Sequence, residues 1–290
     1  MTPRGKVGMR ARLHTKLLLA ITALTLSACA APSATGGDST SATPDLAHVH
    51  GLGVDPADGV LYAASHYGLF KLPPGGTPER VGPVQDVMGF TVVGPRHFLG
   101  SGHPGSRTDG PPHLGLVEST DAGQTWHELS LAGRADLHSI EAKHGLVYAY
   151  DSQSRQIMVT TDMRNWDNRA RLALSDFTVD PANPDVVVAN TADGLMRSDD
   201  GGRSFSPLPD APALVFVEWP ATDTLLGSDP NNTIYVSTDG GLSWARRGQA
   251  PGPPGAFAAS SVSDVYVATE TGIHYSSDGG RTFTVRQVLA

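Results

Sequence analysis

Short apolar runs separated by polar turns fill residues 46–290, and this pattern predicts β-strands throughout the region. Runs such as LYAAS (61–65) and VVVAN (186–190) are rich in Val, Ala, Leu and Tyr. They are bounded by Gly, Asp, Asn or Pro, as strands between tight turns usually are. No stretch of the region repeats its apolar residues with the period of an amphipathic helix. The sequence therefore predicts an all-β fold.

One motif recurs at nearly equal intervals and divides this region into repeats. The pattern S-x-D-x-G-x-[ST]-[WF] begins at Ser119, Ser198, Ser237 and Ser276, and a shorter copy without the glycine begins at Thr160. Successive copies start 41, 38, 39 and 39 residues apart, a period typical of propeller blades. A further unit precedes them, with PPGGTPERV in place of the motif. Six units of four strands predict a six-bladed β-propeller; seven blades stay open if a divergent unit lies between the first two.

The repeated aspartates are predicted to stabilise turns rather than to act as catalysts. Each motif joins two short apolar runs, where an Asp side chain can accept hydrogen bonds from backbone amides across the turn. The Gly takes a backbone conformation closed to other residues, and we expect the aromatic residue to pack beneath the hairpin. The structural aspartates are Asp121, Asp200, Asp239 and Asp278.

Aligning the units on one another predicts which residues share a place in the ring. We expect the first strand of each unit to line the central channel. Three sets of equivalent positions result: His50, Met88, His138 and Ser175 at the start of the innermost strand; His48, Asp86 and Asp136 two residues before them; and His66, His103 and Asp151 at the end of the second strand. Units five and six offer only the neighbourhoods of Val215 and Ala256 at these places.

These positions gather histidines at the mouth of blades one to three, which predicts a transition-metal site. Neutral imidazole is a ligand for copper, zinc, nickel and iron, a thioether favours reduced copper, and a carboxylate behind an imidazole fixes its tautomer. We expect copper or zinc, with Asp86 orienting the ligands His48, His50, His66, Met88, His103 and His138. The alternative is a wet channel mouth that binds no metal. The remaining histidines are expected on the surface: His97, His113, His127, His144 and His274.

The N-terminal segment predicts export and lipid anchoring. Five Lys and Arg residues precede LLLAITALTLSA (17–28), an apolar stretch too short for an ordinary transmembrane helix. It ends in Leu-Ser-Ala-Cys (26–29), which resembles a bacterial lipobox; the alternative is an ordinary secretory signal with a chance cysteine. We predict a lipoprotein signal peptide over 1–28, a flexible tether over 29–45 from a lipidated Cys29, and one propeller domain over 46–290. Cys29 is the single cysteine, so no internal disulfide or thiolate cluster is expected.

The charge of the exported part limits its partners. Residues 1–28 hold five basic and no acidic residues, so the remainder carries 16 Lys and Arg against 29 Asp and Glu, a net charge of −13. Such a surface disfavours nucleic acids and anionic lipids. The membrane contact is therefore expected through the lipid, and the ligand is expected to be a metal, a small molecule or a glycan.

Five stretches carry a resemblance to a known family: HVHGLGVD, MGFTVV, SGHPG, LGLVESTDAGQTW and ADLHSIEA. Together they resemble bacterial exported Asp-box propellers, also called BNR-repeat proteins, that are commonly labelled sialidase-like glycosyl hydrolases. The resemblance implies the propeller fold and importance for the histidine-bearing stretches. The Phe/Tyr-Arg-Ile-Pro motif of true sialidases is missing, so sialidase activity is not expected.

Two other functions stay open. Glycoside hydrolysis needs two carboxylates that flank the scissile bond, and Asp86, Asp136 and Glu141 are the candidates at the mouth, with Asp176 nearby. The third class is a protein-binding scaffold or assembly factor, like the propellers that bind partner proteins in photosystem assembly. No concentrated charged patch marks a docking face in the sequence.

Overall fold

The computed structural model describes residues 46–105 and 110–289, which belong to one compact unit. The predictions for the signal peptide, Cys29 and the tether lie outside the described residues. Every regular element in the described ranges is a β-strand. None of the described residues forms a helix long and apolar enough to cross a membrane.

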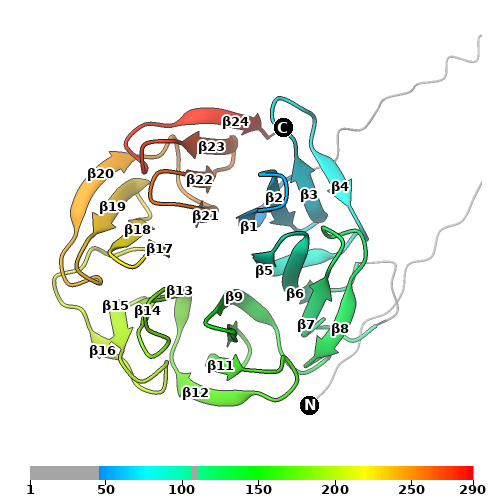
Figure 1. Ribbon diagram of the computed structural model, residues 1–290, viewed down its shortest axis with the longest axis horizontal. Helices are drawn as coiled ribbons and strands as arrows, with labels where there is room; N and C mark the ends of the chain where they lie inside the picture. The colour runs from blue at the N-terminus through cyan, green and yellow to red at the C-terminus, as the bar shows by residue number, and fades with distance from the viewer. Residues whose placement is uncertain (1–45, 106–109, 290) are drawn as a thin grey trace, which may run out of the picture. The chain divides into compact units, whose positions relative to one another are not determined.

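The strands form six sheets of four, each built from one continuous segment of the chain (Figure 1). Their bounds are as follows: blade 1, β1 (Val49–Val54), β2 (Leu61–Ser65), β3 (Gly68–Leu72), β4 (Glu79–Val81); blade 2, β5 (Asp86–Gly94), β6 (His97–His103), β7 (Leu116–Ser119), β8 (His127–Ser130); blade 3, β9 (Leu137–Lys143), β10 (Leu146–Asp151), β11 (Gln156–Thr160), β12 (Asp167–Arg171); blade 4, β13 (Leu174–Val179), β14 (Val187–Thr191), β15 (Gly194–Ser198), β16 (Ser206–Pro207); blade 5, β17 (Phe216–Ala221), β18 (Thr224–Ser228), β19 (Thr233–Ser237), β20 (Ala245–Gln249); blade 6, β21 (Ala256–Ala259), β22 (Val265–Ala268), β23 (Gly272–Ser276), β24 (Thr284–Val288).

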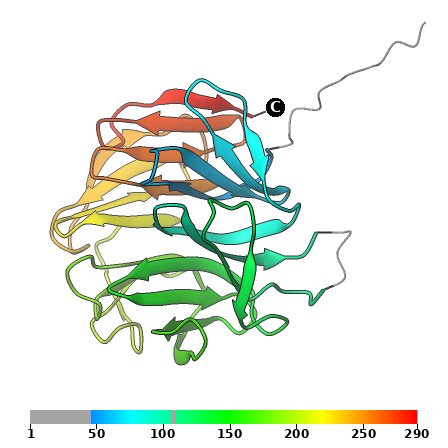
Figure 2. The same cartoon turned by 45° about the vertical axis from the view of Figure 1, so that its right-hand side comes forward.

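The blades succeed one another around a central channel, with the first strand of each blade innermost and the fourth outermost (Figures 1 and 2). Strands that follow one another within a blade pair antiparallel. The prediction of an all-β propeller with six blades is confirmed, and the seven-bladed alternative is wrong. The longer step between the first two units belongs to blade 2, where β6 ends at His103 and β7 begins at Leu116.

Apolar side chains fill the spaces between neighbouring blades. Six buried clusters occur among the described residues, and each joins two successive blades around the ring. Between blades 3 and 4, for example, Tyr148 and Ile157 pack with Phe177 and Val187. The second and third strands of a blade are therefore apolar on both faces, since each face meets a neighbouring blade.

The ring closes between blades 1 and 6 without exchange of a strand. One cluster joins Leu52 and Phe70 of blade 1 to Ala268 and Ile273 of blade 6. Arg286 of β24 adds hydrogen bonds to the carbonyl oxygens of Leu72 (2.8 Å) and Pro73 (3.2 Å). Closure therefore depends on side-chain packing and a few polar contacts.

The repeated aspartates accept hydrogen bonds within their own turns, between the third and fourth strands. In blade 2, Asp121 Oδ1 accepts from the Ser119 hydroxyl (2.8 Å) and the Thr125 amide (2.9 Å), and Oδ2 accepts from the Thr125 hydroxyl (2.6 Å). These hydrogen bonds lower the pKa of Asp121 to about 2. Equivalent bonds surround Asp200, Asp239 and Asp278. Gly123 has φ +85°, and an added Cβ would lie 2.5 Å from Leu69 of blade 1.

Candidate metal centre and channel carboxylates

A β-bulge recurs at the start of the innermost strands of blades 1 to 4. The pairing register jumps from Val49 to Gly51 in β1, and the same jump leaves one residue unpaired in β5, β9 and β13. The four skipped residues are His50, Met88, His138 and Ser175, the residues that the alignment of the repeats places together. A bulge redirects the side chain of its extra residue, and all four line the channel cavity.

His48 does not share an extended strand with His50. It precedes β1 with φ 54°, in the left-handed region, and its side chain is exposed. Its ring still approaches that of His66, with centroids 5.4 Å apart, and the His50 ring lies 4.3 Å from His66. The two histidines therefore meet at His66 through a turn and a bulge rather than through a shared strand face.

His50, His66 and Asp86 form the first of two groups in which three ligand atoms lie within 4.8 Å of one another. His66 Nδ1 is 3.2 Å from His50 Nε2 and 2.9 Å from Asp86 Oδ1. His50 Nε2 is 3.9 Å from the same oxygen. Burial, followed by the charge of His66, lowers the pKa of His50 to about 4, so the His50 imidazole is neutral at physiological pH.

His103, His113 and Asp136 form the second such group. The rings of His103 and His113 lie 5.3 Å apart, and His103 Nε2 is 3.6 Å from Asp136 Oδ2. The prediction that His113 is an unrelated surface residue is wrong. Its segment leaves β6, yet the Leu114 amide bonds to Gly102 O and the Gly133 amide bonds to His113 O, both at 2.8 Å. These bonds hold His113 and Leu114 between the end of β6 and the chain that precedes β9.

Asp136 is buried and takes part in several hydrogen bonds within blade 3. Its Oδ2 accepts hydrogen bonds from His138 Nε2 (2.9 Å) and the Ser152 hydroxyl (3.0 Å). Its backbone amide donates a hydrogen bond to Asp151 Oδ1 (3.0 Å). Burial alone would raise the pKa of Asp136, but the hydrogen bonds from His138 and Ser152 and the charges of His138 and His103 outweigh it and hold the pKa at about 2. Asp136 is therefore ionised at neutral pH and has no proton to donate.

The structure thus brings five of the predicted ligands and two aspartates to one mouth. The histidine–aspartate cluster, as we call it, comprises His48, His50, His66, Asp86, His103, His113, Asp136 and His138. Met88 lies in the equivalent bulge of blade 2 and lines the cavity beside them. The cluster supplies imidazole nitrogens and carboxylate oxygens, a donor set suited to zinc, copper, nickel or iron.

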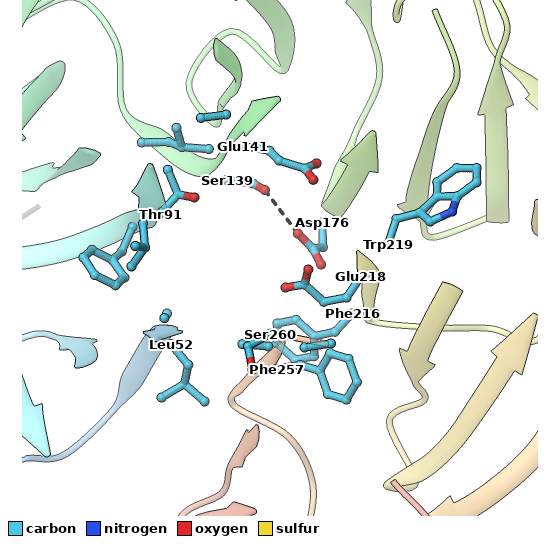
Figure 3. Close-up of a pocket in the computed structure, with 18 of the residues that line it drawn as sticks. Leu52, Thr91, Ser139, Glu141, Asp176, Phe216, Glu218, Trp219, Phe257 and Ser260 are labelled. Atoms are coloured by element: carbon cyan, nitrogen blue, oxygen red, sulfur yellow. Dashed lines mark hydrogen bonds between the residues drawn. The ribbon is translucent and has the colours of Figure 1, made fainter. Parts of the chain in front are cut away.

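A cavity of about 650 Å³ occupies the central channel, and His50 and His138 lie in its wall. Three carboxylates gather on the side of blades 3 to 5, from Glu141, Asp176 and Glu218 (Figure 3). The carboxylates of Asp176 and Glu218 point toward each other, with Leu52 across the cavity. This group, the channel carboxylates, is separate from the aspartates of the mouth.

The channel carboxylates differ in their partners. Glu141 pairs with Lys143 (2.5 Å), whose ammonium also donates to the carbonyl oxygens of Val179 and Trp219. Asp176 accepts from the Ser139 hydroxyl and the Val217 amide, each at 3.1 Å, yet burial raises its pKa to about 7. Burial, followed by the charges of Asp176 and Glu141, raises the pKa of Glu218 well above its usual range. Asp176 is thus suited to hold or release a proton near neutral pH, and Glu218 keeps its proton to a higher pH than an ordinary glutamate does.

Glu218 is a functional candidate that the sequence analysis does not predict. The alignment of the repeats gives the fifth unit only Val215 at the channel positions. A usable signal exists: Glu218 is the third residue of β17 and Asp176 the third residue of β13, both innermost strands. An acidic residue between Val217 and Trp219 on such a strand faces the channel, since alternate residues point to opposite faces.

The remaining histidines lie apart from the cluster. His127 and His144 are exposed, as predicted. His97 is partly buried and contacts Glu118 through Nε2 (2.7 Å). The prediction of a surface position for His274 is wrong: its residue is 5% exposed in β23, with Nε2 3.2 Å from the Thr269 hydroxyl.

Comparisons with known proteins concern the fold of this chain. No protein-family model matches the sequence, and no curated protein matches it. A YCF48 structure with a bound D1 peptide is 18% identical, with TM-score 0.52, over 83% of this chain and 83% of that one. The GH74 xyloglucanase from Xanthomonas campestris is 14% identical, with TM-score 0.51, over 85% of this chain and 55% of the enzyme. A chain of a nidogen–laminin complex is 12% identical, with TM-score 0.57, over 74% of this chain and 88% of its own.

These neighbours include glycoside hydrolases and proteins that bind peptides or other proteins. This chain spans about half the length of the xyloglucanase. At such low identity the likeness concerns the arrangement of strands alone. The protein shares the β-propeller fold of these structures.

Proposed function

We propose that the protein binds a transition-metal ion at the histidine–aspartate cluster. The observation that carries the proposal is the convergence of His50, His66 and Asp86, whose ligand atoms lie within 4.8 Å of one another. Two imidazoles and one carboxylate, with open positions for water or a ligand, form a donor set found in metal centres. The low pKa of His50 supports the proposal, because a metal needs the neutral imidazole.

Zinc and copper(II) fit this donor set better than copper(I), because nitrogen and oxygen dominate it. Reduced copper prefers sulfur, and the one thioether beside the cluster is that of Met88. A Met88→Leu variant separates these ions. We expect it to leave Zn²⁺ affinity unchanged and to weaken binding of copper(I) alone.

The test is metal uptake by the full-length protein, purified without a polyhistidine tag, stripped by chelator and titrated with Zn²⁺ in a calorimeter. We expect at least one equivalent to bind, and His66→Ala to reduce the uptake. His127→Ala is the matched control, since that histidine is exposed on β8. Less than a tenth of an equivalent of any transition metal, before and after titration, contradicts the proposal.

We further propose that the protein is exported and held at the extracytoplasmic face of a membrane by a lipid on Cys29. The apolar stretch 17–28 followed by Leu-Ser-Ala-Cys supports this. Labelling cells with a radioactive fatty acid tests it. Label is expected on the wild-type chain and absent from Cys29→Ser; equal label in both contradicts lipidation at that residue.

Glycoside hydrolysis in the channel is the second candidate, favoured by the raised pKa values of Asp176 and Glu218. A general acid needs a proton at working pH, and a second carboxylate serves as base or nucleophile. Asp136 is ionised and lies with Asp86 at the mouth, so Asp176 and Glu218 become the candidate acids in the channel, with Glu141 as base. A panel of polysaccharides and aryl glycosides tests this activity. Hydrolysis that persists in Asp176→Asn and Glu218→Gln excludes both residues as catalysts.

Peptide binding is the third candidate, suggested by the peptide-bound and protein-bound neighbours. The acidic lining of the channel favours a basic segment. Fluorescence anisotropy with matched lysine-rich and glutamate-rich peptides tests this. Binding of the basic peptide that is lost at high salt supports the idea, and equal binding of both peptides contradicts it.

A further inference from the structure

The histidine–aspartate cluster contains two groups of ligands rather than one. His50, His66 and Asp86 belong to blades 1 and 2, while His103, His113 and Asp136 belong to blades 2 and 3 and the segment between β6 and β7. No residue is common to the two groups. Each has two imidazoles and one carboxylate, the minimum that holds a divalent ion with positions left open.

The second group has unused polar atoms. Within the described part of the chain, His113 Nδ1 and Asp136 Oδ1 are buried and have no hydrogen-bond partner. Buried polar atoms are nearly always satisfied, because an unpaired one costs free energy. The other oxygen of Asp136 is occupied by His138 and Ser152. Both residues that would hold the second ion therefore keep a buried polar atom that no protein group satisfies.

One side chain connects the two groups. Asp86 Oδ1 faces His66 and His50 of the first group, and Asp86 Oδ2 lies 3.3 Å from His103 Nδ1. The opposite nitrogen of His103, Nε2, faces Asp136. A histidine that donates from one nitrogen to a carboxylate is held in the tautomer that presents the other nitrogen to a metal.

We propose that the cluster holds two metal ions, one in each group, and that Asp86 is a ligand of the first ion while it orients His103 for the second. This rests on the proposed metal binding. It adds a second ion and makes His113 one of its ligands. It also means that loss of the Asp86 carboxylate affects both sites. His138, hydrogen-bonded to Asp136, acts as a positioning residue for the second site.

Native mass spectrometry of the full-length protein with Zn²⁺ counts the ions directly. We expect two ions on the wild-type chain, one on His66→Ala, one on His113→Ala and two on the control His127→Ala. One ion on the wild-type chain, or two on His113→Ala, overturns the two-site proposal and leaves metal binding intact. No ion on the wild-type chain overturns both.

The link through Asp86 is tested by comparing two variants that each remove a ligand of the first site. His66→Ala keeps the contact between Asp86 and His103, whereas Asp86→Asn loses the charged acceptor. Zn²⁺ affinity of the remaining site is expected to be about 10- to 100-fold weaker in Asp86→Asn than in His66→Ala. The Co²⁺ absorption spectrum of that site should also shift between the variants. Affinities within twofold of each other, with identical spectra, overturn the link.

Discussion

Ionisation of Glu218 places a charge in the channel beside the carboxylates of Asp176 and Glu141. The surrounding protein replaces water that would otherwise solvate the charge, and neighbouring negative charges add repulsion. Lys143 opposes this only in part, because its ammonium is already paired with Glu141. The native state therefore binds a proton at Glu218 more tightly than the unfolded chain does.

This difference makes stability depend on pH. Below about pH 4.5, Glu218 is protonated in both states and contributes no difference; as pH rises, the unfolded state ionises first, so the folded state loses relative stability. Glu218→Gln removes the effect and is expected to raise the free energy of unfolding at pH 8, with no gain at pH 4. Urea denaturation at both pH values measures this.

Glu128→Gln serves as the control for this prediction, because Glu128 is exposed on β8. The control is expected to change stability equally little at both pH values. A stabilisation of Glu218→Gln that is the same at pH 4 and pH 8 contradicts the explanation.

At the scale of elements, the bulges and glycines of the inner strands set the direction of the side chains in the histidine–aspartate cluster. Gly102 precedes His103 in β6, with φ +148°, and an added Cβ would lie 1.9 Å from the Asp86 carbonyl oxygen. That contact lies between the two strands that present Asp86 and His103 to the mouth.

Gly102→Ala is therefore expected to lower stability by ~2 kcal/mol or more and to weaken Zn²⁺ binding, because β5 and β6 must separate. Gly94→Ala in the same blade has no atom within 4 Å of the new Cβ and should change neither property. Thermal unfolding and Zn²⁺ titration measure both effects. Unchanged Zn²⁺ affinity in a folded Gly102→Ala protein contradicts this role.

The repeated turns form a second class of element, and their aspartates make them sensitive to acid. The lowered pKa of Asp121 means that its stabilising effect is fully present above about pH 4 and is lost as pH falls towards 2. Asp121→Ala is expected to lower the melting temperature at pH 7 and to lower it less at pH 2.5. Asp210→Ala, at an exposed residue outside the motif, should have little effect at either pH. Equal losses at pH 7 and pH 2.5 contradict the prediction.

The repeat pattern carries most of what the sequence predicts at this scale. A motif of eight residues marks one hairpin in each of four blades and a shortened copy marks a fifth, so the period, extended to the first unit, predicts the number and order of the strands. It also gives the equivalence of His50, Met88 and His138, because a bulge at the same register preserves their places. His113 escapes such reasoning because the segment between β6 and β7 has no counterpart in the other blades. Its position depends on two backbone hydrogen bonds that no period indicates.

At the scale of the whole molecule, the ring depends on six apolar interfaces, and among the described residues the one between blades 1 and 6 has no chain link across it. Ile273 of β23 and Ile157 of β11 are both fully buried, in the clusters of blades 1 and 6 and of blades 3 and 4 respectively. Either isoleucine, replaced by Ala, should cost ~2–5 kcal/mol of stability.

The two variants should lose stability in different blades. Ile273→Ala is expected to speed hydrogen exchange first in blades 1 and 6, because these blades can part without breaking the chain. Ile157→Ala should speed exchange mainly in blades 3 and 4. Mass spectrometry of peptides from each blade reads this out. The same exchange pattern in both variants contradicts a ring closed by side-chain packing and a few polar contacts.

The absence of a shared strand at the closure means that the covalent order of the blades is not tied to their spatial order. Each link from one blade to the next runs from an outermost strand to the neighbouring innermost strand, as residues 82–85 do between β4 and β5. A link of similar length from residue 289 to residue 46 would complete the same pattern. A circular permutant opened between blades 4 and 5, at residues 208–215, would then keep all six blades and all six interfaces. The residues of the histidine–aspartate cluster, which all belong to blades 1 to 3, would remain on one uninterrupted segment of that rearranged chain.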